Sequence, residues 1–435
     1  MLKDSQLFAQ HRQELMRSMK GGVAVIPTSP VRNRNNDVDY LYRPDSDFYY
    51  MTGFSEPESV AVLCPGRKGG EYILFCREKD PEKEIWHGRR AGLEGAVEYY
   101  GADDAFPMAD IGDILPSLLE DKEKIFYNVG RYPEFDQQIM TWLNDIKQRS
   151  RSGVVAPYEL IDLGHYLHEQ RLVKRKEEIA IMRKAAKISA RGHIRAMQSC
   201  RPGMTEQQVQ AELEYEFRRL GSTDNAYPSI VAGGENACIL HYIDNNAVLN
   251  DGDLLMIDAG AELDCYASDI SRTFPVNGRF SDEQKELYQI VLDAQQAAFS
   301  VCESGQHWNR PHEKAVEVLT QGLVDLKILQ GNVADLIETQ AYRPFYMHRT
   351  GHWLGLDVHD VGDYQIEREW RALEAGMVFT VEPGLYIGKN PDVDPKWHDI
   401  GIRIEDDVVI KKAGYEILTT DVPKTIEDIE TLMMA

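Results

Sequence analysis

The sequence predicts an α+β fold with two domains, a smaller N-terminal α/β domain over residues 1–172 and a larger domain over residues 173–435. Three observations predict it. The length of 435 residues exceeds what a single hydrophobic core usually serves. Near residue 172 the chain changes from short apolar runs to long, charged helices with one apolar stripe. Strand-like segments then alternate with these helices, which favours helices packed against a mostly antiparallel sheet.

The elements of the N-terminal domain are expected at its apolar runs. These are GGVAVIP (21–27), ESVAVLCPG (58–66) and EYILFCRE (71–78), which lie between turn-forming Gly and Pro residues. We expect strands there with helical stretches between them, and therefore an α/β domain.

The C-terminal domain is expected to contain three amphipathic helices. The first carries an apolar stripe within residues 168–193, the second begins at a capping box of Thr205 and Gln208, and the third begins at Ser281. Strands are expected at four apolar segments, which are DLLMIDAG from residue 253, DISRTFPV from 269, GMVFTVEPGLYI from 376 and GIRIEDDVVI from 401.

Composition argues against several classes of protein. The net charge of −23 disfavours nucleic acid or an anionic membrane as a partner, because both would be repelled. No apolar run is long enough to span a membrane, and the first residues lack the apolar core of a signal peptide, so a cytoplasmic protein is expected. The six cysteines form no CxxC pair and are expected to be reduced thiols.

Two segments of the C-terminal domain are similar to one another. VLNDGDLLMIDAG (248–260) aligns without gaps with ALEAGMVFTVEPG (372–384), so that Asp258 and Glu382 fall at the same place. Chance or generic turn–strand chemistry is an alternative explanation. If the similarity is real, the domain contains two related halves, each of which delivers a carboxylate from a strand end into a shared centre.

Asp258 and Asp269 flank a segment that we expect to form a hairpin. With a turn at Leu263–Asp264, the two aspartates would lie directly opposite one another, roughly 5 Å apart. Two carboxylates at that distance repel unless a cation or a proton lies between them, and their apolar neighbours indicate partial burial. A metal ion would resolve the repulsion. The alternative is that one acid is solvated and the other caps a turn.

Two further acids and a histidine-rich segment strengthen the metal interpretation. Glu382 ends an apolar strand, Glu405 lies in GIRIEDD, and HRTGHWLGLDVHD (348–360) contains three histidines. Taken singly, Glu405 would be an exposed strand residue or an ion-pair partner of Arg403. Carboxylates with one imidazole suit Mn²⁺ or a similar ion. Two such ions about 3.5–4 Å apart can hold a bridging hydroxide nucleophile.

These acids and the histidine occur in the order of the metal ligands of a known family, as Asp258, Asp269, His352, Glu382 and Glu405. The segments HRTGHWLGLDVHD, TVEPGLYI and GIRIEDD match its motifs, and YRPDSDFYYMTGFSEPES matches an N-terminal block. In these features the chain resembles the aminopeptidase P and prolidase family of dinuclear metallopeptidases, whose catalytic domain has the pita-bread fold. The resemblance spans nearly the whole chain. One departure is Arg349, where relatives often carry a small residue such as Gly; it leaves the metal set intact and concerns the rim of the pocket.

The resemblance implies a role for each of the five ligands. His352 would be the imidazole ligand, Asp258 would hold one ion and Glu382 the other. Asp269 and Glu405 would bridge the two ions. Glu382 would also take the proton when the bridging water or hydroxide attacks the scissile carbonyl.

The resemblance also implies contacts with the substrate. His359 would donate a hydrogen bond to the substrate carbonyl or its oxyanion, and His241 and His348 would be the remaining pocket histidines. Tyr386 and Arg403 would orient ligands. Without the resemblance, His241 is a surface or satisfied core histidine, and Tyr386 and Arg403 serve sheet packing and an ion pair.

Trp86 in EIWHGRRAG resembles a tryptophan that helps to close the pocket in aminopeptidase P. Without the resemblance, it would be an exposed interface residue. Self-association into a dimer or tetramer is expected from the family alone.

The reaction implied by the resemblance is hydrolysis of the bond between an N-terminal residue and a following proline in Xaa-Pro-Yaa peptides, with two divalent ions, preferably Mn²⁺. The nearest alternative is a prolidase restricted to Xaa-Pro dipeptides, which has the same metal residues. A metal-free, creatinase-like amidinohydrolase and a non-catalytic pita-bread binding protein are further alternatives. The complete ligand set disfavours both.

Overall fold

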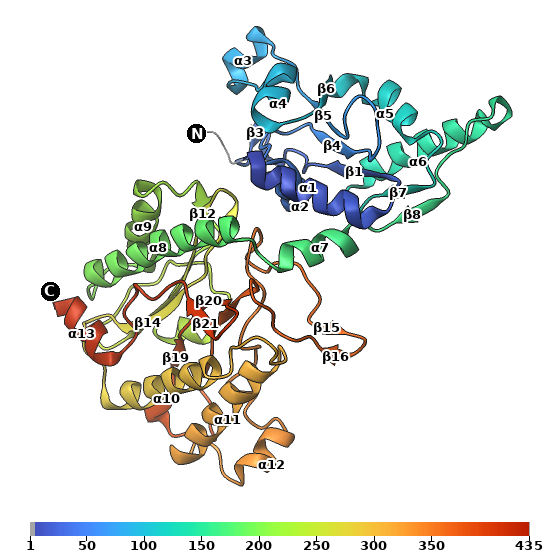
Figure 1. The fold of residues 1–435 in the computed structure, drawn as a ribbon. Helices are drawn as coiled ribbons and strands as arrows, with labels where there is room; N and C mark the ends of the chain where they lie inside the picture. Colours follow the sequence, from blue (N-terminus) through green and yellow to red (C-terminus); the bar gives the residue numbers. More distant parts are fainter. Residues whose placement is uncertain (1–4, 435) are drawn as a thin grey trace. The chain divides into compact units, whose positions relative to one another are not determined.

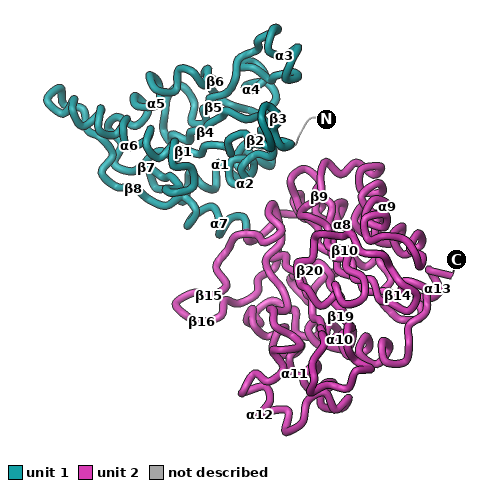
Figure 2. The backbone as a smooth tube through the Cα atoms, turned by 180° about the vertical axis from the view of Figure 1, so that it is seen from behind, with its two compact units in different colours: residues 1–171 teal, residues 172–435 magenta. Residues whose placement is uncertain are grey.

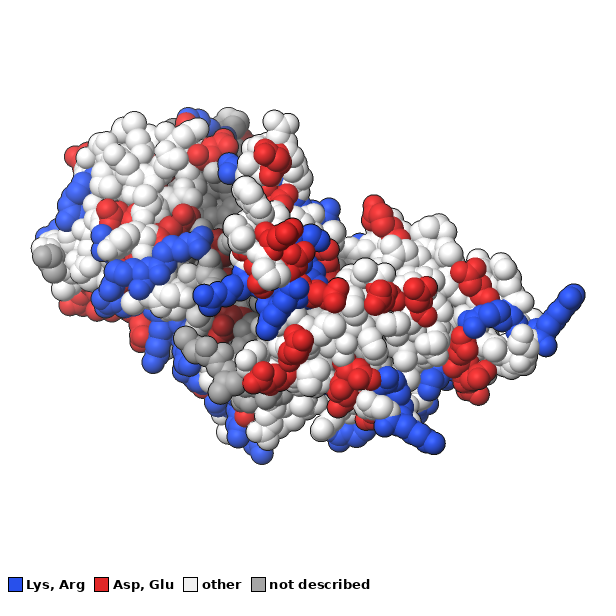
Figure 3. All heavy atoms as spheres, turned by 90° about the horizontal axis from the view of Figure 1, so that it is seen from above, with Lys and Arg blue, Asp and Glu red and all other residues white. Residues whose placement is uncertain are grey.

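The structure of the chain is a computed structural model that describes residues 5–434. It divides into two compact units, one up to Arg171 and one from Leu172 onward (Figure 1, Figure 2). None of the described helices is long and apolar enough to cross a membrane. On the face drawn in Figure 3, acidic and basic side chains are interspersed.

The first unit is built on one six-stranded sheet with the strand order β6-β5-β4-β1-β7-β8. The antiparallel strands β1, β4 and β5 lie at the three apolar runs of the sequence, and β6, β7 and β8 are added in parallel. The strands of this unit are β1 (Val23–Pro27), β2 (Asn33–Asn35), β3 (Val38–Asp39), β4 (Val60–Leu63), β5 (Tyr72–Cys76), β6 (Asp104–Pro107), β7 (Lys124–Phe126) and β8 (Glu159–Ile161).

Helices cover both faces of this sheet. Val25 and Val62 point into a core with α5 and α6, whereas the alternate residues Ala24 and Ala61 are buried on the face that α2 contacts. The sheet is therefore the centre of an α/β unit, as predicted. Its helices are α1 (Ser5–Met19), α2 (Ser46–Thr52), α3 (Pro81–His87), α4 (Gly92–Tyr100), α5 (Ile111–Leu119), α6 (Pro133–Gln148) and α7 (Gly164–Leu172).

The second unit places small antiparallel sheets between two pairs of helices (Figure 1). Helix α8 packs on α9 and contacts β12 and β13, whereas α10 packs on α11 and contacts β17, β18 and β19. The predicted capping box of Thr205 and Gln208 is present at the start of α9. Ser281, the predicted start of the third helix, caps α10 and forms a capping box with Gln284. This arrangement is the predicted α+β domain.

The helices of this unit are α8 (Lys176–Ser199), α9 (Glu206–Arg219), α10 (Asp282–Phe299), α11 (Arg310–Asp325), α12 (Val333–Glu338) and α13 (Ile426–Met434). The strands are β9 (Asp224–Asn225), β10 (Ile230–Gly233), β11 (Leu254–Asp258), β12 (Ala261–Leu263), β13 (Tyr266–Ala267), β14 (Ser271–Pro275), β15 (Gln365–Ile366), β16 (Glu369–Trp370), β17 (Val378–Val381), β18 (Gly384–Ile387), β19 (Ile400–Arg403), β20 (Asp406–Ile410) and β21 (Tyr415–Ile417).

The hairpin between the two aspartates exists, but its predicted register is wrong. Asp258 pairs with Ser271 rather than with Asp269. The turn is centred on Asp264 and Cys265, whose φ angles of 48° and 65° are typical of a tight two-residue turn and move the register by one residue on each strand. Asp269 precedes Ser271 by two residues, so the two aspartates are diagonal neighbours on the same face.

The two similar segments have the same local structure. Gly252 and Gly376 both adopt positive φ, at 90° and 102°, and each lies two residues before a strand, β11 or β17. Asp258 ends β11 and Glu382 follows β17, and both acids line one cavity. The two segments therefore deliver their carboxylates into a shared centre.

A buried polar network joins β14 to β20 behind this centre. Arg272 Nη2 lies 2.7 Å from Asp406 Oδ1, and both side chains are fully buried. The other carboxylate oxygen of Asp406 accepts from Lys424 at 2.7 Å and from Gln295 at 3.0 Å. Because Arg272 also donates to the backbone carbonyl of Glu405 at 2.6 Å, the network holds the strand end that carries Glu405.

Candidate metal centre

A cavity of about 1160 Å³ opens at the strand ends of the second unit. The predicted site residues that line it are His241, Asp258, Asp269, His348, His352, His359, Glu382, Arg403 and Glu405. Tyr386 is buried beside them, where its hydroxyl meets Arg403 and His348. Trp86 lies on α3 of the first unit with 82% of its surface exposed, whereas every residue that lines the cavity belongs to the second unit.

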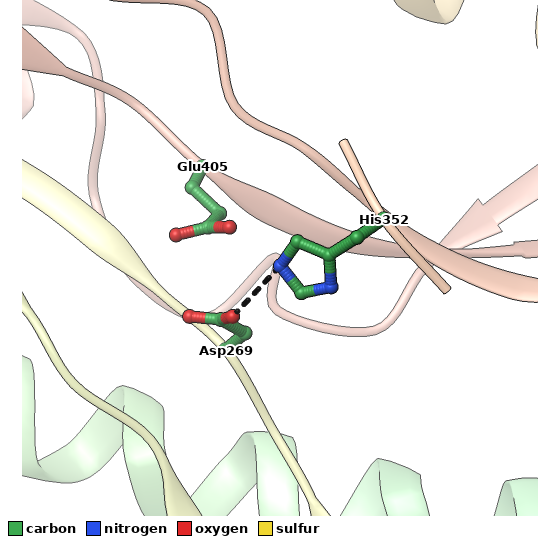
Figure 4. Close-up of side chains that lie close together, drawn as sticks. All are labelled: Asp269, His352 and Glu405. Carbon is green, nitrogen blue, oxygen red and sulfur yellow. Dashed lines mark ion pairs between the residues drawn. The ribbon is translucent and has the colours of Figure 1, made fainter. Parts of the chain in front are cut away.

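Three of the predicted ligands form a tight cluster. Asp269, His352 and Glu405 each offer a donor atom, and these atoms lie within 4.8 Å of one another (Figure 4). The Nε2 atom of His352 lies 3.4 Å from Asp269 Oδ2. The other ring nitrogen, Nδ1, lies 3.0 Å from the backbone carbonyl of Trp353, and a proton donated there leaves the Nε2 lone pair free for a metal.

The other two predicted ligands flank this cluster. Glu382 Oε1 lies 3.7 Å from His352 Nε2. Asp258 is held by Arg403, whose Nη2 lies 2.6 Å from Asp258 Oδ2. Ser271, on the strand next to β11, donates to Glu405 at 2.7 Å. The five ligands thus reach one cavity from three strand ends and two connecting segments.

The electrostatics of the cluster indicate a site for a cation. Burial raises the pKa of Asp258, raises that of Glu382 to about 7, and raises that of Glu405 well above its usual range, where Asp269 adds to the effect. For Asp269, burial opposes ionisation, but the hydrogen bond and charge of His352, together with the hydrogen bond of Tyr227, outweigh it and the pKa is lowered. Burial also disfavours charged His352, yet Asp269 and Glu382 raise its pKa to about 9. Four buried carboxyl groups thus share one environment with a single arginine and one histidine, which is typical of a cation site.

The donor set fits a divalent metal ion. Figure 4 shows the two carboxylates and the imidazole pointing toward one common space. Oxygen donors with one imidazole suit Mn²⁺, Zn²⁺ and related ions, and the outer hydrogen bonds that orient such ligands are present on His352, Asp258 and Glu405.

Comparison with known proteins assigns the chain. The pattern of metallopeptidase family M24 matches residues 180–412, which is more than half of the chain. The chain belongs to metallopeptidase family M24. The pattern of the aminopeptidase P N-terminal domain matches residues 8–127. This M24 hydrolase therefore has the two-domain aminopeptidase P fold with a pita-bread catalytic domain, and the resemblance seen in the sequence is confirmed.

The M24 enzyme is similar along nearly its whole length to Xaa-Pro aminopeptidases. It is 45% identical to the Xaa-Pro aminopeptidase of Escherichia coli K12 over 432 residues, 99% of this chain and 98% of the relative. The structure of Pseudomonas aeruginosa aminopeptidase PepP matches with a TM-score of 0.99 at 55% identity, over 100% of this chain and 99% of that one. The structure of Zn-substituted E. coli aminopeptidase P in complex with product matches with a TM-score of 0.97 at 44% identity, over 100% of this chain and 99% of that one. These relatives favour an Xaa-Pro aminopeptidase over a prolidase and support the use of a divalent metal.

The pocket histidines of the M24 enzyme differ in whether their ring nitrogens are free to bind a substrate. Both ring nitrogens of His348 are engaged, Nδ1 with the backbone carbonyl of Arg349 at 2.7 Å and Nε2 with the Tyr386 hydroxyl at 2.8 Å. Burial lowers its pKa to about 3, so His348 is neutral and positions Tyr386. His241 and His359 are exposed to the cavity and make no hydrogen bond within the described chain.

A buried ion pair supports the loop that carries His359. The next residue, Asp360, lies 2.8 Å from Lys174 Nζ, and each of these side chains is only 1% exposed. The Asp360 backbone N–H donates to the carbonyl of Trp353 at 2.9 Å. These contacts hold His359 over His352, with 4.3 Å between the ring centroids.

Tyr227 is a site residue that sequence reasoning missed. Its hydroxyl donates to Asp258 Oδ1 at 2.6 Å and also contacts Asp269 Oδ1. The only signal in the sequence is the pair Tyr227–Pro228 just ahead of β10, which is ordinary turn chemistry. The hydroxyl thus links Asp258 and Asp269, which are diagonal neighbours on the two strands of the hairpin.

We expect Tyr227→Phe to weaken Mn²⁺ binding by about 10–100-fold, because it removes the hydrogen bond that orients both aspartates. Isothermal titration calorimetry of the metal-free protein measures this. Tyr266→Phe is the matched control, since it also removes a buried tyrosine–carboxylate bond, to Glu178 at 2.8 Å, away from the cavity. Equal affinities for Tyr227→Phe and the control would contradict the orienting role.

Proposed function

We propose that the chain is an Xaa-Pro aminopeptidase that uses two divalent ions, Mn²⁺ by preference, to release an N-terminal residue from a following proline. One observation carries the proposal. A buried cluster of carboxylates and one imidazole lies in a cavity large enough for a peptide, in a chain that matches Xaa-Pro aminopeptidases along nearly its whole length.

The residues proposed to hold the two ions are Asp258, Asp269, His352, Glu382 and Glu405. When bound, the ions would supply an activated water and polarise the scissile carbonyl. Arg403 and Tyr227 would keep the Asp258 carboxylate in place through the hydrogen bonds described above.

The chain's own groups are proposed to move the proton and meet the developing charge. Glu382 is the proposed proton acceptor, because burial raises the pKa of its carboxyl to about 7 and a base near the working pH is efficient. His359 and His241 are proposed to donate to the scissile carbonyl oxygen, because their ring nitrogens face the cavity without another partner in the described chain. His348 acts on the substrate side through Tyr386.

Proline at the second position suits this kind of site. Its amide nitrogen carries no hydrogen and its φ is fixed, so peptidase subsites that require that donor bind it poorly. A site that acts on the carbonyl through metals and histidines does not need the missing donor.

The proposal includes the cellular compartment of the enzyme and its self-association. None of the six cysteines, all of which lie in the described chain, forms a disulfide, which suits a reducing compartment such as the cytoplasm. Helix α3 buries none of its residues and exposes 81% of Ile85 and 82% of Trp86. An apolar pair of this kind supports contact with another copy in a dimer or tetramer, where Trp86 would help to close a pocket.

The test is an assay on enzyme that is stripped with a chelator and reloaded with Mn²⁺ or Zn²⁺. We expect no hydrolysis before reloading, two ions per chain after it, and a kcat/KM for an Xaa-Pro-Yaa tripeptide at least about tenfold above that for an Xaa-Pro dipeptide, a difference of about 1.4 kcal/mol. Preference for the dipeptide would make the enzyme a prolidase. Full activity with fewer than two ions per chain would contradict the two-ion mechanism.

A further inference from the structure

Arg349 brings a positive charge into a cavity whose metal centre is acidic. The residue lines the cavity, its guanidinium lies 5.2 Å from the centre of the Trp370 ring, and it donates to the side-chain oxygen of Asn309. Among the described residues, no carboxylate forms an ion pair with it. The charge of Glu313 acts on it, but that carboxylate is held by Arg310 at 3.0 Å and by Asn309 at 2.9 Å. Its charge is therefore available to a ligand.

The other arginine of the cavity is already engaged. Arg403 is 3% exposed and binds Asp258 at 2.6 Å, the Tyr386 hydroxyl at 2.9 Å and Ser271 at 3.0 Å. An anionic group of a substrate would have to displace Asp258 to reach it. Within the described chain, no carboxylate forms an ion pair with Arg349 in this way.

The charges in the cavity are separated in space. The ring of His348 links Arg349 to the acidic centre, since its Nδ1 lies 2.7 Å from the Arg349 carbonyl and 3.7 Å from Glu382 Oε2. The Arg349 side chain instead reaches Trp370 on β16 and Asn309 just ahead of α11. The cavity thus has an acidic centre and a basic group on the wall formed by β16 and the start of α11.

We propose that Arg349 binds the C-terminal carboxylate of short peptide substrates and so makes the enzyme favour peptides that end soon after the proline. This inference rests on the proposed function. If the scissile carbonyl of an Xaa-Pro-Yaa peptide lies at the metal centre, its carboxylate follows about 7 Å further along the chain. The planar guanidinium, which lies over the Trp370 ring and is tethered to Asn309, is pre-organised to donate two parallel hydrogen bonds to that carboxylate.

The experiment compares an Xaa-Pro-Yaa tripeptide that has a free C-terminal carboxylate with the same peptide as its C-terminal amide. Turnover is measured on the metal-loaded enzyme, and binding by calorimetry on the chelator-treated enzyme. The variants are Arg349→Gln, Arg349→Lys and the control Arg343→Gln, which removes an exposed arginine that bonds Gln340 and does not line the cavity.

The wild type is expected to favour the free acid by about tenfold in both KM and affinity, the size of one charge-assisted contact. Arg349→Gln should abolish this preference, because it weakens binding of the free-acid peptide and leaves binding of the amide unchanged. Arg349→Lys should retain part of the preference, and Arg343→Gln should retain all of it. An equal loss for acid and amide would mean that Arg349 only braces the wall, and would overturn the inference. So would a wild type that binds both peptides equally. Binding that prefers the acid without turnover of either peptide would support the inference and refute the proposed aminopeptidase.

Discussion

Asp269→Asn is expected to lower kcat/KM for an Xaa-Pro-Yaa peptide by about a thousandfold or more, on the order of 4 kcal/mol in the activation barrier. Asp269 is the acid of the cluster closest to His352, at 3.4 Å, and its pKa is lowered, so it is the acid best prepared to bind a cation. Asparagine keeps the shape of the side chain but removes its charge. The protein should therefore stay folded, with an unchanged circular dichroism spectrum and fewer bound ions per chain. His352→Ala should have a similar effect on activity.

The matched control is Asp264→Asn, the same change in the turn of the same hairpin. Asp264 is exposed and adopts a φ of 48°, a conformation that asparagine tolerates. It should behave as the wild type in activity and metal content. Turnover close to that of the wild type in Asp269→Asn, with a full complement of metal, would rule out the assignment of Asp269 as a ligand.

Arg272→Met is expected to lower the free energy of unfolding by about 3–5 kcal/mol, the usual cost of removing one partner from a buried ion pair. Burial opposes ionisation of Asp406, and Arg272 is the largest of the interactions that lower its pKa despite this. Without Arg272, the Asp406 carboxylate keeps its contact with Lys424 but loses the guanidinium that lies 2.7 Å away. The backbone carbonyl of Glu405 also loses the hydrogen bond that Arg272 donates. Urea denaturation of the metal-free protein measures the change.

Arg279→Met provides the comparison, because its ion pair with Glu430 spans 3.4 Å and its side chain is 64% exposed. Solvent screens such a pair, so the expected change is within about 1 kcal/mol. If the two substitutions lower the free energy of unfolding equally, burial of the Arg272–Asp406 pair does not increase its contribution to stability.

The sequence determined much of this protein because its decisive features are local. Glycine turns, alternating apolar residues and capping boxes act over a few residues, so β1, β4 and β5, the starts of α9 and α10, and the strand ends that carry Asp258 and Glu382 could be predicted. The four acids among the proposed ligands were also candidates, because buried acids at strand ends are costly without a cation. His352 was singled out among three histidines by the resemblance to the family. The register of the hairpin was predicted wrongly by one residue on each strand, since the left-handed conformations of Asp264 and Cys265 depend on a choice between adjacent turns.

Only the tertiary structure decided how these groups meet. Tyr227 lies 31 and 42 residues from the aspartates that it links, and Arg272 lies 134 residues from Asp406. No periodicity relates residues so distant, because their contact depends on how the sheets pack rather than on local conformation. The same is true of His348, whose Nε2 is taken by Tyr386, 38 residues away, and of the Arg349 guanidinium beside Trp370. Residue type and spacing thus indicated the metal chemistry, whereas packing decided which groups orient the ligands and which remain available to a substrate.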